Sequence, residues 1–111
     1  MVRHELKTDR FVFDRTWNEK KNYEIRFNDR NFKVGDALLL RETRYSGAEM
    51  SKGIVPLEYT GREILVYCRS ILHGEIYGLK RGWVIMSTVV REYRFTPEYK
   101  KEERARAKTD G

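Results

Sequence analysis

The sequence has few of the residues that stabilise small proteins through covalent bonds or metal ions. Its only cysteine, Cys68, has no second thiol for a disulfide within the chain. Because Cys68 ends the apolar run 64–68, we expect a buried thiol and a reducing compartment. The two histidines, His4 and His73, are far apart and give no metal-ligand spacing. We therefore expect no metal site and no cofactor.

Long apolar stretches are also missing. No segment approaches the roughly eighteen uncharged apolar residues that a transmembrane helix requires. The first five residues, Met1–Glu5, lack the apolar region of a secretion signal. The sequence contains no internal repeats. These absences predict a soluble, cytoplasmic protein without a membrane interaction.

Charged residues, in contrast, are abundant. They make up 36% of the 111 residues, and 23 Lys and Arg outnumber 17 Asp and Glu, giving a formal net charge of +6. A basic excess favours a polyanionic partner such as RNA, although many basic proteins bind no nucleic acid. Because 40% of the residues are apolar, the chain has enough material for one hydrophobic core.

Patterning along the chain predicts an α+β, mostly β protein with one early helix. The helix is expected over about 10–20 and docks through Phe13 and Trp17, which are four residues apart. Residues 43–58 show no period and are expected to form the longest loop. β segments are expected at 4–7, 22–27, 37–40, 63–72 and 83–90.

Short strands of this kind favour a small, mostly closed β barrel with the helix across one opening. We assign residues 1–90 to this barrel and 91–111 to a charged C-terminal extension. Within that extension, 91–95 can prolong the last strand. Thr96-Pro97-Glu98 is then a good start for a charged tail helix.

The most informative stretch is the densely charged segment Lys20–Arg30. If residues 22–27 form a strand, apolar and charged side chains alternate between its two faces. We expect Tyr23, Ile25 and Phe27 to face the core and Glu24 with its polar neighbours to form a working surface. The four residues 28–31 favour a turn.

Four blocks of sequence, in order, resemble a known family. They are His4–Lys7, Lys21–Asp36, Tyr59–Arg62 and Tyr77–Ser87. Together they are similar to an ASCH domain of the PUA-like barrel superfamily, and most similar to its small subgroup named domain of unknown function 3850. The resemblance covers about residues 3–88.

The wider ASCH family carries a G-x-K-x-x-E-x-R motif at the exit of its first helix. Lys21, Glu24 and Arg26 match the last three positions, whereas Glu19 stands in the glycine position. The resemblance implies a barrel cleft in which these side chains face a nucleic acid or a nucleotide-like ligand.

The chemistry of these residue types suits such a ligand. Lys21 can meet a phosphate as a point charge, and the planar guanidinium of Arg26 suits a phosphate or a base edge. Glu24 can accept a hydrogen bond from an exocyclic amine. The predicted binding set also includes a wider basic rim and one stacking aromatic: Lys7, Arg30, Arg62 and Tyr59. The simpler interpretation is a surface ladder of ion pairs.

Two other functions stay open. Small ASCH amidohydrolases that act on N4-acetylcytidine are similar over the same block, and Lys21 matches their lysine. Glu24, however, stands where they have a threonine, and Glu63 or Glu75 would have to supply their later glutamate. The resemblance also implies a phage or mobile-element context, where small relatives of this subgroup look common. This favours a third function, in which the charged tail, residues 98–108, binds a host protein.

Overall fold

The computed structural model describes residues 2–96. In chain order the elements are β1 (Arg3–Asp9), α1 (Arg10–Trp17), β2 (Tyr23–Phe27), β3 (Ala37–Thr43), α2 (Gly47–Ser51), β4 (Tyr59–His73) and β5 (Trp83–Phe95). Strand β5 continues through the segment 91–95. The tail helix expected after Thr96 lies outside the described residues.

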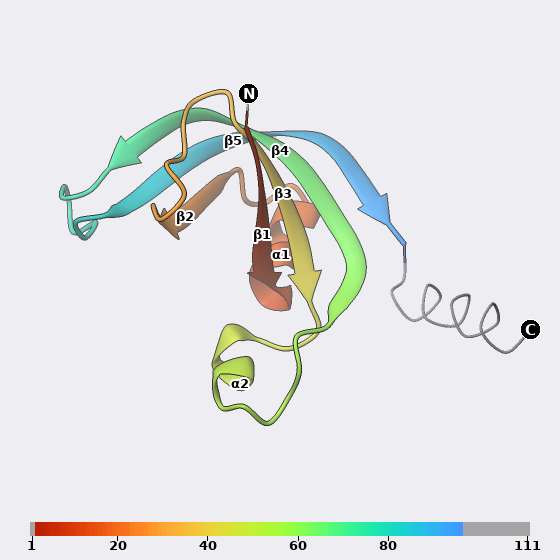
Figure 1. The fold of residues 1–111 in the computed structure, drawn as a ribbon. Helices are drawn as coiled ribbons and strands as arrows, with labels where there is room; N and C mark the ends of the chain where they lie inside the picture. Colours follow the sequence, from red (N-terminus) through yellow and green to blue (C-terminus); the bar gives the residue numbers. More distant parts are fainter. Residues whose placement is uncertain (1, 97–111) are drawn as a thin grey trace, which may run out of the picture.

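The strands form one sheet in the order β1-β3-β4-β5-β2. β1 and β3 are parallel, and the other neighbouring strands are antiparallel. The two long strands, β4 and β5, arch over α1 and curl the sheet into a half-barrel (Figure 1). Register shifts between these strands at Leu65/Val66 and Cys68/Ser70 add to the curl, because a bulge bends its strand. The predicted mostly β fold with one early helix is confirmed.

The core lies between the concave face of the sheet and α1. Its largest fully buried apolar side chains include Phe13 of α1, Leu38 and Leu40 of β3, Ile64 of β4 and Met86 of β5. Strand β3 is buried along nearly its whole length, as its uncharged sequence predicted. The core therefore fixes α1 and the central strands against one another.

Helix α1 docks through the predicted aromatic pair. Phe13 is fully buried, and its ring centroid lies 5.8 Å from that of Trp17. The helix ends at Trp17, earlier than expected, and Glu19 then adopts a left-handed backbone with φ of 61°. Glycine favours this conformation. Glu19, which stands at the glycine position of the ASCH motif that the sequence resembles, thus forms the turn that leads to Lys21 and β2.

The prediction for the two faces of β2 is wrong. Tyr23, Ile25 and Phe27 are 41%, 47% and 52% exposed, whereas Glu24 is 2% exposed. The alternation itself is present, but β2 is an edge strand whose apolar residues lie on the outer face. There they pair across to β5, with Phe27 opposite Trp83. Glu24 points inward because nearby cations compensate its charge.

The predicted loop over 43–58 contains the short helix α2, which the sequence analysis missed. Ser46 caps it: its hydroxyl accepts from the backbone N–H of Glu49, and the Glu49 side chain accepts from the backbone N–H of Ser46. This reciprocal pair is the capping box that the spacing Ser-x-x-Glu encodes.

Candidate functional site

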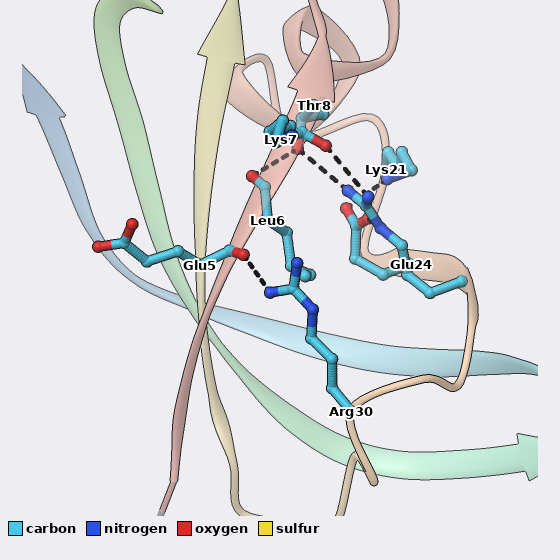
Figure 2. Close-up of polar contacts among 8 residues, drawn as sticks. Glu5, Leu6, Lys7, Thr8, Lys21, Glu24 and Arg30 are labelled. Carbon is cyan, nitrogen blue, oxygen red and sulfur yellow. Dashed lines mark hydrogen bonds and ion pairs between the residues drawn. The ribbon is translucent and has the colours of Figure 1, made fainter. Parts of the chain in front are cut away.

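Lys21 and Glu24 form a buried ion pair where the turn after α1 enters β2. Lys21 Nζ lies 2.5 Å from Glu24 Oε1, and the residues are 7% and 2% exposed. Figure 2 shows the two side chains meeting beside the end of β1. A buried carboxylate requires close cationic partners, because removing it from water costs several kcal/mol. The pair is therefore a defined part of the fold and not a mobile surface contact.

Arg26 completes this charged group and ties it to the neighbouring edge strand. Its Nε donates to Glu24 Oε2 at 3.3 Å. Its Nη1 donates to the backbone carbonyl of Lys7, and its Nη2 donates to the hydroxyl of Thr8, both at 3.1 Å. The Arg26 side chain is only 25% exposed. Much of its donor capacity is thus used within the protein.

Arg30 makes a similar bridge further along β1. Its Nη1 donates to the backbone carbonyl of Glu5 (Figure 2). β1 and β2 are the two edges of the sheet, so no backbone ladder joins them. Arg26 and Arg30 span this opening with side chains and satisfy carbonyls that the edge strand would otherwise leave to water.

The Lys21–Glu24–Arg26 group lines an open cavity of about 530 Å³ between α1, β2 and the end of β1. Four cationic and two acidic side chains lie around it, together with exposed apolar ones. The full lining is Lys7, Thr8, Asp9, Phe11, Val12, Arg15, Lys21, Tyr23, Glu24, Ile25 and Arg26. We call this space the basic cleft. It brings together four of the predicted site residues, namely Lys7, Lys21, Glu24 and Arg26.

The comparison with known families agrees with the residue range over which the sequence resembles a family. The family model described as Domain of unknown function (DUF3850) matches residues 3–88. The chain belongs to this family. No curated protein matches the chain. The matched residues include every strand and helix that forms the basic cleft of this DUF3850 domain.

The α1 wall of the cleft was missed in the sequence analysis. Phe11 is 71% exposed, and the Arg15 guanidinium lies 4.8 Å from its ring centroid. The two residues are four apart and therefore share a helix face. That spacing was a usable signal, but nothing in the sequence shows which side of α1 faces β2.

Three predicted site residues of the DUF3850 domain lie outside the cleft. Arg30 bridges to Glu5, as described above. Tyr59 stacks against the guanidinium of Arg41, whose Cζ lies 3.7 Å from the centroid of the Tyr59 ring. Arg62 belongs to a separate cluster between α1 and the sheet. The cleft consequently includes fewer residues than the basic rim that the sequence predicted.

Arg62 holds α1 against the sheet. Its Nε donates to Glu42 Oε1 at 2.9 Å, its Nη2 donates to Glu42 Oε2 at 2.5 Å, and Nη2 also contacts the Asp14 carboxylate. The hydrogen bonds with Glu42 raise the pKa of Arg62 above its ordinary value; burial opposes this shift and Asp14 adds to it. The guanidinium also lies 5.0 Å from the ring centroid of Trp17. These contacts give Arg62 a structural role between α1 and the sheet.

The glutamates considered for hydrolysis do not meet Lys21. Glu63 accepts from Arg41 Nε at 2.9 Å on the central strands. Glu75 is exposed in the turn after β4, where its carboxylate lies 3.8 Å from Arg81. Neither residue lines the basic cleft. Lys21 and Glu24 are the only members of the proposed hydrolytic set that this part of the structure brings together.

Over residues 2–96, no group of three or more His, Cys, Asp or Glu side chains is placed to hold a metal ion. Within the same range, neither helix is long and apolar enough to cross a membrane.

Proposed function

We propose that this DUF3850 domain is an RNA- or modified-nucleotide-binding module that uses the basic cleft. The observation that carries the proposal is that Lys21, Glu24 and Arg26, far from forming a surface ladder, line one open cavity together with Lys7 and Arg15. A volume of about 530 Å³ suits a ligand of the size of a nucleotide.

The cations of the cleft divide into two groups. Lys21 and Arg26 are directed to Glu24, so much of their charge is compensated within the protein. Lys7 and Arg15 are exposed at the mouth of the cleft. These two side chains are therefore the main phosphate contacts of the proposal, because an exposed cation gains most from neutralising a phosphate.

The aromatic and acidic groups favour a base in addition to a phosphate. Phe11 and Tyr23 both line the cleft and are 71% and 41% exposed; Arg15 lies over the first ring and Lys21 over the second, so each ring can stack a base on its other face. Glu24 presents an acceptor-only carboxylate held in a fixed position by Lys21 and Arg26. Such an acceptor selects a base edge with an exocyclic amine over one that has only a carbonyl.

A salt-dependent titration tests this function. Fluorescently labelled single-stranded and hairpin RNA is titrated with the protein at two salt concentrations. The logarithm of the binding constant falls by about 0.7 per phosphate contact per decade of salt for a single strand. Arg15→Ala should weaken binding and reduce this slope by about 0.7.

Lys33→Ala is the matched control. Lys33 is exposed in the turn before β3 and does not line the basic cleft. Its variant loses the same net charge as Arg15→Ala and should retain binding. Equal weakening by both substitutions, or none by Arg15→Ala, would reject the cleft as the binding site. Lys21→Ala is less suitable, because it leaves Glu24 buried with one cation fewer.

A further inference from the structure

A second cavity of about 530 Å³ adjoins the basic cleft on the side of α2. It is lined by Lys7, Asp9, Gly47, Met50, Ser51, Val55 and Leu57. We call it the α2 cavity. Lys7 and Asp9 line both spaces, so the two cavities meet at the end of β1. The two cavities are therefore neighbours that share a boundary at these two residues.

The α2 cavity differs from the basic cleft in its chemistry. Met50, Val55 and Leu57 give it an apolar wall, and Leu57 is 45% exposed. Lys7 is the only cation in its lining. An apolar wall with a single cation at one end suits the face of a base whose phosphate lies toward that cation.

The wall is held in place by hydrogen bonds to β1 and within α2. The backbone N–H of Gly47 donates to Asp9 Oδ1 at 3.0 Å, which joins the start of α2 to the shared boundary of the two cavities. The capping box of Ser46 and Glu49 fixes the same turn. The Asp9 carboxylate is thus held at the boundary by Gly47 and keeps its negative charge, so a phosphate there depends on the charge of Lys7.

We propose that the α2 cavity receives the nucleotide next to the one in the basic cleft, so that the ligand is a single-stranded oligonucleotide and not a mononucleotide. This inference rests on the proposed nucleotide-binding function. The second base lies against Met50, Val55 and Leu57, and the linking phosphate passes Lys7. The proposal commits to one strand crossing the end of β1, because that is where the cavities join.

Calorimetric titration with adenylates of one, two and four nucleotides tests this inference. Adenine carries an exocyclic amine for Glu24 and has a large stacking surface. The dinucleotide should bind about tenfold more tightly than the mononucleotide, in line with the effect of one stacked base. Leu57→Ser should remove most of that gain and leave the mononucleotide affinity unchanged.

Val34→Ser provides the matched control, because Val34 is 63% exposed and lines neither cavity. The Val34→Ser variant should keep the full gain in affinity from the mononucleotide to the dinucleotide. Equal affinities for one and two nucleotides, or an equal loss for both ligands in Leu57→Ser, would overturn the inference. If labelled RNA still depends on Arg15 in that case, the proposed function stands and only the second subsite fails. If no adenylate binds and labelled RNA does not bind either, both proposals fail.

Discussion

At the scale of single residues, Glu19 links the family motif to backbone geometry. It occupies the position where the wider ASCH motif has glycine, and its φ of 61° lies in the left-handed region. A residue with a Cβ is strained there by roughly 1 kcal/mol. Among residues 2–96, its carboxylate has only a long contact to offset this strain, accepting from the Tyr93 hydroxyl at 3.5 Å.

Replacing Glu19 with glycine should therefore be tolerated, with a free energy of unfolding equal to that of the parent or up to about 1 kcal/mol higher. Urea denaturation measures the difference. Lys20→Gly is the neighbouring control and should not stabilise, because Lys20 does not have a positive φ. A clear loss of stability in Glu19→Gly would contradict the strained turn.

Asp36 is a second residue whose charge depends on the fold. Its carboxylate lies 2.8 Å from His4 Nε2 and accepts from the backbone N–H of Lys33 at 3.0 Å. Burial alone would raise the pKa of Asp36, but the hydrogen bonds with His4 and Lys33 lower it below the ordinary value. The ionised form consequently stabilises the folded state at neutral pH and loses this effect as the pH falls through the lowered pKa.

Asp36→Asn should lower the free energy of unfolding by about 1–3 kcal/mol at pH 7, the usual effect of losing hydrogen bonds to a charged group. The difference from the parent should begin to narrow at about pH 3, because the Asp36 carboxylate of the unfolded parent takes up a proton below its ordinary pKa of about 3.9 while the folded parent, whose pKa is lowered, holds its charge to lower pH. Urea denaturation at both pH values checks this. A difference that stays constant with pH would show that the charge of Asp36 contributes nothing.

At the scale of elements, α1 is held by Arg62 as well as by its aromatic residues. Glu42 is 2% exposed, and its carboxylate accepts from the Thr60 hydroxyl at 2.5 Å and from Arg62. Arg62 also reaches Asp14 on α1. The position of the cleft wall formed by α1 thus depends on a charged cluster on the other side of the helix.

Arg62→Met should destabilise the protein by about 3 kcal/mol, because it leaves the Glu42 carboxylate buried without its cation. The double variant with Glu42→Gln should regain part of this loss. Arg94→Met is the exposed control: it breaks the Arg94–Glu92 pair and should change stability by less than about 1 kcal/mol. Urea denaturation of the parent, Arg62→Met, Glu42→Gln and the double variant gives the coupling energy between the two residues, and Arg94→Met is measured beside them. Similar losses in Arg62→Met and Arg94→Met would contradict the buried cluster.

The elements also show what the sequence could and could not predict. Strand periodicity, the uncharged run of β3 and the Phe13–Trp17 spacing were sufficient for the strands and for the docking of α1. The alternation in β2 predicted which residues share a face, but not which face points to the core. A buried Glu24 is stable only beside cations that the fold brings to it. Arg62 was placed at the site by charge alone, whereas its partner Glu42 is distant in sequence.

At the scale of the whole molecule, the sheet stops short of a closed barrel, and side chains bridge its two edge strands. Arg26 and Arg30 donate to backbone carbonyls of β1 across this opening. The basic cleft lies beside the same opening, between α1 and β2. Two arginines of the family block therefore support the architecture of the cleft, and Lys7 and Arg15 supply its exposed charge.

The most direct test of the basic cleft is to map binding on the protein by NMR. Single-stranded RNA is titrated into ¹⁵N-labelled protein, and backbone amide shifts are followed in saturating ligand. We predict that the largest changes fall in residues 7–15 and 21–26. Changes concentrated instead around Phe27 and Trp83, which line neither cavity, would contradict the account.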